Sequence, residues 1–327
     1  MMTPREIILA NIEHIGASRP GLNFEWGRIN DMLFASPGAP AGYEQKRWTE
    51  GEYEYYDDIW GNIWWRLAER SAKGEIFKPA LKDWDALETL EVPDYEDPQC
   101  YAGMREIFSQ PTDLFRIAHI GGWVFDDARY LRKLEVYLMD MGMYPDELMD
   151  LNARVAGVYE AKVRGAAECG ADGIMIGEDL GTQNGLLFSP EMWRFYFKDI
   201  YTRLWGLAHE HGMKVFMHSC GYNWELLDDL IEAGVDCFQF DQPAVYDMPA
   251  LAEKLRMAKV ALWSPIDIQK VLPTGDRAFI EEETEKMIEI FNGGLILKNY
   301  PDLHGIGVEP EWDQWAYEKI LELACPP

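Results

Sequence analysis

A regular alternation of short apolar segments with longer amphipathic segments runs through residues 114–323. The short segments, such as 173–177 and 214–219, have the length and composition of buried strands. Gly212 and Gly234 each stand between a predicted helix and the strand that follows it, where a helix commonly ends on a glycine. Strands that are joined by helices in this way run parallel, so the sequence predicts an α/β protein built from βαβ units.

At least six such strands follow one another without interruption, which favours a closed (β/α)8 TIM barrel over an open sheet. No G-x-G-x-x-G motif follows an early strand, so a dinucleotide-binding sheet has no support. The chain has 327 residues, of which 48% are hydrophobic, enough for the core of one large domain. We therefore predict a single barrel domain over residues 1–327. Residues 1–110 are expected to form an N-terminal helix, loops and an aromatic hairpin that cover the barrel.

The net charge of the chain limits the partners that it can bind, and its cysteines indicate the cellular compartment. A formal net charge of −27 argues against binding to nucleic acid or to an anionic membrane surface. No run of about 18 apolar residues is present, so no membrane span is expected. The five cysteines are an odd and scattered set. This set fits a protein of the reducing cytoplasm better than a disulfide framework.

His218 and Cys220 stand two residues apart where the strand 214–219 is expected to end. Side chains at positions i and i+2 of a strand point to the same side, so the imidazole and the thiol can converge. Both are zinc ligands when the cysteine is a thiolate and the histidine is neutral. The alternative is a hydrogen-bonded structural histidine beside a small buried cysteine. Zinc needs three or four ligands, so other segments would have to supply the rest.

Polar and aromatic residues also occur at the other predicted strand ends, which meet at one end of a barrel. These residues are Trp123, Glu178, Asp179, Asp241, Gln242, Asp267, Tyr300 and His304. We predict His304, in the loop after a late strand, as the third metal ligand. The alternative for His304 is a solvated loop residue. Three protein ligands with one open position are the arrangement of catalytic zinc.

Glu178 and Asp179 are predicted as catalytic carboxylates that act as acid or base, although one of them could instead cap the following loop. Trp60 lies in an aromatic stretch, residues 55–65, that fits either a pocket wall or a half-buried hairpin. Gln183 belongs to the loop after Asp179. The residues predicted to bind substrate are Trp60, Trp123, Gln183, Asp241, Gln242 and Tyr300.

Several motifs resemble those of the uroporphyrinogen decarboxylase superfamily. They are Gly177–Gln183, Leu187–Trp193, His218–Gly221 and Ile231–Asp236. The similarity covers roughly residues 55–323, and the order and spacing of the motifs make it specific. The resemblance implies a (β/α)8 barrel. The superfamily contains decarboxylases of heme synthesis and zinc-dependent, corrinoid-linked methyltransferases.

The resemblance is stronger to the methyltransferases than to the decarboxylases. The decarboxylases share an arginine-rich N-terminal segment that binds the propionate groups of the substrate. The corresponding residues 23–28 of this sequence contain a single arginine, Arg28. The methyltransferases share an H-x-C pair, which matches His218 and Cys220. Their third zinc ligand is a cysteine in a late loop, where this sequence has His304. The resemblance thus implies zinc, a small-molecule methyl donor or acceptor, and a corrinoid carried on a separate protein.

Three functions remain open from the sequence. The favoured one is a zinc-dependent methyltransferase that moves a methyl group to or from the corrinoid. The second is a metal-free uroporphyrinogen decarboxylase or another decarboxylase or lyase. The third is a non-catalytic barrel that binds a small ligand. Members of the superfamily are often homodimers, and no feature of this sequence decides whether the chain forms one.

Overall fold

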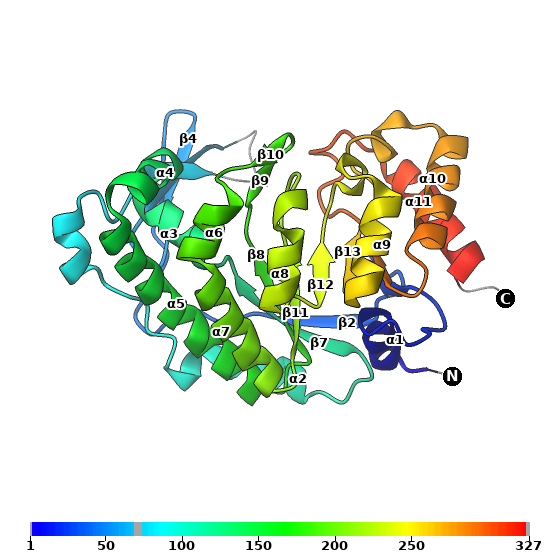
Figure 1. Ribbon diagram of the computed structural model, residues 1–327, viewed down its shortest axis with the longest axis horizontal. Helices are drawn as coiled ribbons and strands as arrows, with labels where there is room; N and C mark the ends of the chain where they lie inside the picture. Colours follow the sequence, from blue (N-terminus) through cyan, green and yellow to red (C-terminus); the bar gives the residue numbers. More distant parts are fainter. Residues whose placement is uncertain (1, 69–73, 325–327) are drawn as a thin grey trace.

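The computed structural model describes residues 2–68 and 74–324 of the chain (Figure 1). The barrel strands are β1 (Gly21–Asn23), β2 (Met32–Ala35), β7 (Phe115–Gly121), β8 (Gly173–Gly177), β11 (Lys214–His218), β12 (Cys237–Gln239), β13 (Ala261–Ser264) and β14 (Leu295–Lys298). Within the described residues these eight strands pair in parallel in the order β1-β14-β13-β12-β11-β8-β7-β2. Asn23 at the end of β1 forms an antiparallel bridge with Asn30, which lies just before β2, and the barrel is nearly closed. The prediction of a (β/α)8 barrel is confirmed.

Helices surround the barrel, and α1 packs against its N-terminal end. The helices are α1 (Pro4–Ile12), α2 (Ala102–Ser109), α3 (Val124–Arg132), α4 (Leu134–Met143), α5 (Pro145–Glu168), α6 (Pro190–Tyr196), α7 (Lys198–Glu210), α8 (Leu227–Ala233), α9 (Met248–Ala258), α10 (Arg277–Ile290) and α11 (Pro310–Ala324). Helix α1 begins at a reciprocal cap in which Thr3 and Glu6 each accept a hydrogen bond from the backbone of the other. Ile8 and Ile12 of this helix belong to the buried cluster inside the barrel, so α1 seals that end.

The barrel interior changes from apolar to polar along the strands. Ile117 of β7 and Phe216 of β11 belong to the buried cluster inside the barrel. Alternate side chains of a strand share a face, so His119 and His218, two residues further along, also point inward. Gln239 of β12 pairs in register with His218 and continues this polar layer. The polar end is the C-terminal end of the strands, where barrel enzymes place their active sites.

A separate antiparallel sheet lies beside the barrel (Figure 1). Its strands are β3 (Arg47–Glu50), β4 (Tyr53–Asp57), β5 (Ile63–Leu67) and β6 (Glu75–Lys78). Trp64 of β5 meets Tyr130 of α3 edge to face, with ring centroids 4.7 Å apart, and this contact joins the sheet to the barrel. The aromatic stretch 55–65 forms most of the paired strands β4 and β5. Residues 1–110 also supply β1 and β2, so they build part of the barrel as well as the sheet beside it.

None of the helices in the described part of the chain is long and apolar enough to cross a membrane.

Candidate functional site

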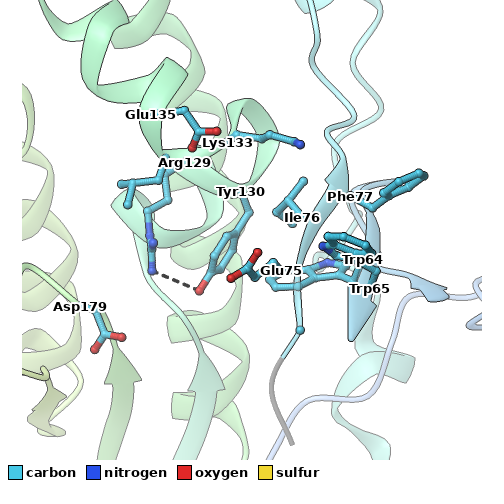
Figure 2. A pocket seen from close by; sticks show the side chains of 12 residues that line it. Trp64, Trp65, Glu75, Ile76, Phe77, Arg129, Tyr130, Lys133, Glu135 and Asp179 are labelled. Carbon is cyan, nitrogen blue, oxygen red and sulfur yellow. Dashed lines mark hydrogen bonds between the residues drawn. The ribbon is translucent and has the colours of Figure 1, made fainter. Parts of the chain in front are cut away.

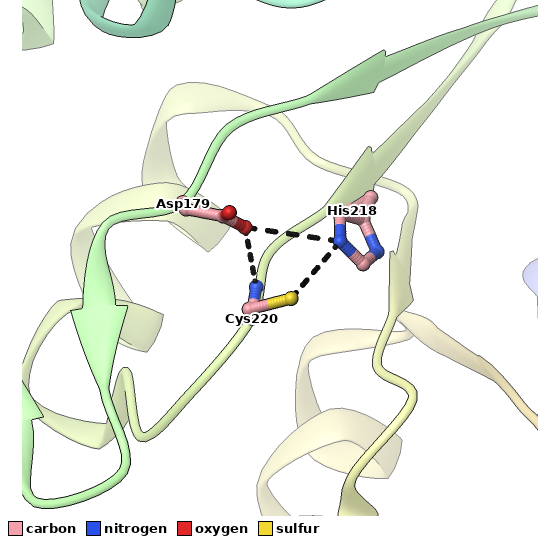
Figure 3. Close-up of side chains that lie close together, drawn as sticks. All are labelled: Asp179, His218 and Cys220. Carbon is pink, nitrogen blue, oxygen red and sulfur yellow. Dashed lines mark hydrogen bonds and ion pairs between the residues drawn. The ribbon is translucent and has the colours of Figure 1, made fainter. Parts of the chain in front are cut away.

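Three side chains with metal-binding groups meet at the C-terminal ends of β8 and β11 (Figure 3). Asp179 follows β8, His218 is the last residue of β11, and Cys220 lies in the next loop. His218 Nε2 is 3.3 Å from Cys220 Sγ and 3.8 Å from Asp179 Oδ1, and one ligand atom of each residue lies within 4.8 Å of the others. The backbone N–H of Cys220 donates to Asp179 Oδ1 at 3.0 Å. We call Asp179, His218 and Cys220 the three-residue cluster.

Gln239 fixes the imidazole of His218. His218 Nδ1 lies 2.5 Å from Gln239 Oε1. The amide nitrogen of Gln239 donates to Asp241 Oδ1 at 2.7 Å, and Lys298 Nζ donates to the same oxygen at 3.2 Å. Because the Gln239 nitrogen is committed to Asp241, its oxygen is the atom that accepts from His218. Nδ1 therefore carries the proton in neutral His218, and Nε2 presents its lone pair to the cluster.

The loop that carries Cys220 is held by its own hydrogen bonds. Asn223 Nδ2 donates to the carbonyl oxygens of Cys220 and Gly221 at 3.1 and 3.3 Å. The Tyr246 hydroxyl donates to the carbonyl of Gly221 at 2.9 Å. Gly221 has a φ of +79°, and a Cβ atom there would lie 2.5 Å from the carbonyl oxygen of Thr182. This loop therefore packs directly against the short hairpin of β9 (Gly181–Thr182) and β10 (Gly185–Leu186).

Glu178, which we predict as a catalytic carboxylate beside Asp179, is completely buried. Its Oε2 accepts a hydrogen bond from the backbone N–H of Phe125 at 3.0 Å, and its Oε1 is buried without a hydrogen-bond partner in the described residues. Burial raises the pKa of the Glu178 carboxyl well above its ordinary value, and the charge of Asp126 raises it further. Glu178 thus ties β8 to the start of α3, while Asp179 joins the cluster.

A largely buried ion pair on α3 lies close to these carboxylates. Arg129 Nε donates to Asp126 Oδ1 at 2.6 Å. Burial raises the pKa of Asp126 to about 7, although Arg129 acts in the opposite direction. The negative charge of Asp179 raises the pKa values of both Asp126 and Arg129. The guanidinium of Arg129 therefore lies within electrostatic range of the three-residue cluster.

A cavity of about 660 Å³ opens between helices α3 and α4 and strands β5 and β6 (Figure 2). Its lining includes Trp64, Arg129 and Tyr130, and Asp179 lies at one end. The cavity therefore leads to the three-residue cluster. Its volume is within the range of small-molecule binding sites.

His304, which we predict as the third metal ligand, is not part of the cluster. Its side chain is exposed, and its carbonyl accepts a hydrogen bond from the backbone of Gly307 at 3.1 Å in the loop after β14. The third member of the cluster is Asp179. The reason is the strand order: β8 is the direct neighbour of β11, whereas β12 and β13 separate β11 from β14.

The two tryptophans predicted to bind substrate lie outside the cavity lining. Trp123 is completely buried and packs against Tyr159 and Trp205, with ring centroids 4.8 and 6.3 Å away. These partners belong to α5 and α7, so the indole of Trp123 fills the layer between barrel and helices. Trp60 is 7% exposed, and its indole N–H donates to Asp127 Oδ2 at 3.2 Å.

The other residues predicted to bind substrate are distributed around the cluster. Gln183 is exposed in the turn between β9 and β10, where its amide donates to Gln269 at 3.4 Å. Asp241 supports Gln239 as described above, and Gln242 beside it is half-buried. Burial raises the pKa of Tyr300, and the nearby Asp241 and Cys220 raise it further. Tyr300 therefore lies within electrostatic range of the cluster.

Sequence reasoning missed several residues that build this site. Gln239 could have been found, because it stands two residues before Asp241 on the strand next to His218. Arg129 and Tyr130 gave no such signal, since they lie on the predicted helix after Trp123 and reach the site only because the antiparallel sheet packs beside that helix.

The fold and the cluster together define a (β/α)8-barrel protein with a candidate metal site at the C-terminal ends of its strands. Residues 70–299 match the uroporphyrinogen decarboxylase (URO-D) family. Because the match spans more than half of the chain, the protein belongs to this family.

One of the similar solved structures supports the fold. A methyltransferase from Methanosarcina mazei superposes with a TM-score of 0.60 at 15% sequence identity, covering 78% of this chain and 73% of the other. An endo-β-1,4-xylanase from Gloeophyllum trabeum gives a TM-score of 0.41 at 11% identity, covering 64% of this chain and 76% of the other. No curated protein sequence matches the chain. At 15% identity the likeness to the methyltransferase shows a shared barrel fold alone, and family membership leaves decarboxylation and methyl transfer both open.

Proposed function

We propose that this protein is a zinc-dependent methyltransferase that moves a methyl group between a small molecule and a corrinoid carried on a separate protein. The observation that carries the proposal is the convergence of Asp179, His218 and Cys220 at the C-terminal end of the barrel. The resemblance of the H-x-C pair to that of zinc-dependent methyltransferases supports it.

The donor set fits a tetrahedral zinc ion. Zinc bonds of about 2.0 Å to nitrogen or oxygen and about 2.3 Å to sulfur place neighbouring ligand atoms about 3.3–3.6 Å apart. The His218 nitrogen lies 3.3 Å from the Cys220 sulfur and 3.8 Å from the Asp179 oxygen, so only small side-chain adjustments are required. Three protein ligands would leave one position for a reactant, as in catalytic zinc sites.

The surroundings of His218 also fit a metal ligand. Histidines that bind metals usually donate their other ring N–H to an oxygen, which fixes the tautomer and the ring orientation. The contact between Nδ1 and Gln239 Oε1 has this form. A zinc ion held there would act as a Lewis acid toward the heteroatom that carries or receives the methyl group. The chain itself would hold the ion and orient the substrate along the cavity that reaches Asp179.

The arginines of the N-terminal region favour this proposal over decarboxylation of a porphyrinogen. Arg28 donates to the buried Asp313 at 2.5 Å and to Gln314 at 2.8 Å. Arg19 forms a two-point ion pair with the buried Asp31 at 2.6 and 2.8 Å. Both guanidinium groups are thus engaged in structural ion pairs, whereas a porphyrinogen would need cations to bind its propionate groups.

The state of the cysteines is relevant to the cellular compartment in which the protein works. None of the cysteines in the described part of the chain, which are Cys100, Cys169, Cys220 and Cys237, forms a disulfide, and Cys325 lies outside the described residues. A zinc-binding thiolate persists best where thiols stay reduced, so we place the protein in the cytoplasm.

Metal analysis and a methyl-transfer assay test the proposal. We expect one zinc ion per purified chain, lost in Cys220→Ala and His218→Ala. The zinc form should transfer a methyl group from a methylated small molecule to free cob(I)alamin, or from methylcobalamin to a thiol, and both reactions are followed by the visible spectrum of the corrinoid. A chain that binds no zinc and instead decarboxylates uroporphyrinogen would overturn the proposal and establish the second function.

A further inference from the structure

His119 is a histidine inside the barrel that water can reach. It pairs in register with Met175 of β8, and Met175 belongs to the buried cluster inside the barrel, so the His119 ring points inward as well. His119 is nevertheless exposed. It stands near the C-terminal end of β7, so water reaches the ring through the open end of the barrel. No hydrogen bond joins the ring to another residue in the described part of the chain, and both ring nitrogens are therefore available to a bound molecule.

The inward positions of β7, β8 and β11 place His119 opposite the three-residue cluster. Deeper in the barrel, the rings of Phe115 and Phe216 lie 5.7 Å apart, and a Cβ atom at Gly173 would lie 3.2 and 3.0 Å from them. The two rings therefore meet over Gly173. Positions an even number of residues apart on a strand share a face. Four residues further along the three segments, the corresponding positions are His119, Gly177 and Cys220. This repeat sets the imidazole and the thiol on opposite sides of a glycine at the barrel mouth.

The space between His119 and the cluster is open. Gly177 has no side chain, and the only atoms of the described residues within 4 Å of a Cβ there, apart from its chain neighbours, are two carbon atoms of His218 at 3.9 Å. Neighbouring strands lie about 4.8 Å apart, so the backbones of β7 and β11, on either side of β8, are roughly 10 Å apart. A small molecule held at the cluster would therefore have His119 on its other side.

A β-bulge and a buried lysine fix the backbone directly after His119. The register of β7 against β8 shifts between His119 and Gly121, and bulges of this kind re-aim side chains beside functional sites. The buried Lys162 of α5 donates from Nζ to the carbonyl oxygen of Ile120 at 3.2 Å. The same ammonium lies 4.7 Å from the ring centre of Tyr159. The bulge is thus held from outside the barrel, and His119 keeps its direction toward the barrel mouth.

The surroundings of His119 favour the neutral imidazole. Although water reaches the ring, partial burial in the barrel wall lowers the pKa of His119 below its ordinary value, and the nearby Lys162 and His218 lower it further. Lys162 acts from α5 behind the strand and His218 from β11 across the barrel. A neutral imidazole can take up a proton from a bound molecule.

We infer that His119 is the base that takes the proton of the methyl acceptor while the acceptor is held at the three-residue cluster. The inference rests on the proposed function and adds a catalytic residue to it. With a thiol as acceptor, the S–H bond breaks and its proton moves to a ring nitrogen of His119. The sulfur electron pair forms the new bond to the methyl carbon. The carbon–cobalt bond of the partner's methylcorrinoid breaks, and its electron pair stays on cobalt as Co(I). His119 then returns the proton to water at the barrel mouth.

Methyl transfer from methylcobalamin to two thiols of different acidity tests this role. His119→Gln keeps a polar side chain but cannot take up a proton, so kcat/KM with 2-mercaptoethanol should fall at least about 100-fold, while the zinc content stays unchanged. The loss should be clearly smaller with the more acidic 2,2,2-trifluoroethanethiol, which needs less help from a base. His211→Gln, at the exposed end of α7 beyond the opposite end of β11, should match the wild type with both thiols. An equal loss with both thiols would give His119 a structural role and overturn the inference.

Nuclear magnetic resonance of the histidine rings gives a second measurement that does not depend on catalysis. The chain has six histidines, and the ring signals of His119 are those missing from His119→Gln. When 2-mercaptoethanol binds the zinc-loaded protein these signals should shift, and the pKa of His119 should rise because a neighbouring thiolate favours the protonated ring. The signals of His211 should not move. His119 signals that ignore the bound thiol would overturn the inference.

The two measurements separate failure of this inference from failure of the proposed function. If the wild-type protein binds zinc and transfers the methyl group, and His119→Gln matches its rate, the base assignment alone is wrong. If the wild-type protein carries no zinc and transfers no methyl group, the proposed function fails and the inference fails with it.

Discussion

His218 Nδ1 lies 2.5 Å from Gln239 Oε1 across the neighbouring strands β11 and β12. The Gln239 amide is itself oriented by Asp241, which pairs with Lys298. This series of hydrogen bonds fixes one tautomer of the His218 imidazole and turns Nε2 toward the three-residue cluster. The orientation of His218 is therefore set by the barrel interior before any ligand binds.

Replacing Gln239 should weaken metal binding without removing a ligand. Gln239→Leu deletes the acceptor for Nδ1, so the ring can rotate and take the other tautomer. Loss of such a supporting contact typically costs about 10–100-fold in metal affinity, and we expect a loss of this size in chelator-competition titrations with zinc. Gln239→Glu keeps an acceptor oxygen and should bind zinc more tightly than Gln239→Leu. Wild-type affinity in Gln239→Leu would contradict this role.

The third ligand can be decided by comparing Asp179→Ala with His304→Ala. Asp179 lies in the cluster and His304 does not, so we expect Asp179→Ala to lose most of its zinc and His304→Ala to keep the full content. Elemental analysis of the purified variants gives the answer, and thermal melts confirm that both are folded. Zinc loss in His304→Ala with retention in Asp179→Ala would restore the assignment made from sequence.

The fold could be predicted because its signal is local and repeated. Each βα unit carries its own apolar strand and its own turn, so the barrel follows from the series without knowledge of distant contacts. The order of the strands around the barrel also follows from the order of the units in the sequence. The position of the antiparallel sheet beside the barrel was harder to predict, since it involves contacts such as that between Trp64 and Tyr130, which are distant in the sequence.

The candidate site could be predicted only in part. His218 and Cys220 lie two residues apart at the end of β11. Their spacing in the sequence was therefore enough to predict that their side chains converge. The choice between Asp179 and His304 depended on which strand is the neighbour of β11, and the family resemblance pointed to the more distant loop. The prediction that Trp123 binds substrate had a different weakness. Trp123 lies two residues after the end of β7, but its indole turns outward and packs in the helical layer.

The buried Glu178 should make stability depend on pH. Its pKa is raised in the folded state by burial and by Asp126, so the folded protein holds this proton more strongly than the unfolded chain. The free energy of unfolding should therefore fall as pH rises from about 4.5 toward the folded-state pKa. Glu178→Gln does not titrate, and its stability relative to wild type should increase by more than about 1 kcal/mol between pH 5 and pH 8.

Thermal or denaturant unfolding at several pH values measures this difference. Glu253→Gln, which changes an exposed carboxyl on α9, is the matched control and should track the wild type at every pH. A constant stability difference between Glu178→Gln and wild type from pH 5 to pH 8 would show that Glu178 ionises normally in the folded protein.

The tight packing of the Cys220 loop gives the last prediction. Gly221 and Gly212 lie beyond opposite ends of β11 with φ values of +79° and +74°, so alanine should cost each site a similar backbone strain of roughly 1–2 kcal/mol. A Cβ at Gly212 meets no atom within 4 Å, whereas a Cβ at Gly221 would lie 2.5 Å from the Thr182 carbonyl oxygen. Gly221→Ala must therefore also displace the loop or the β9–β10 hairpin.

We expect Gly221→Ala to be the less stable variant in thermal melts and to bind zinc at least roughly ten-fold more weakly, because Cys220 moves with the loop. Gly212→Ala should lose stability but keep its zinc affinity, and equal zinc affinities in the two variants would show that Cys220 does not depend on this packing.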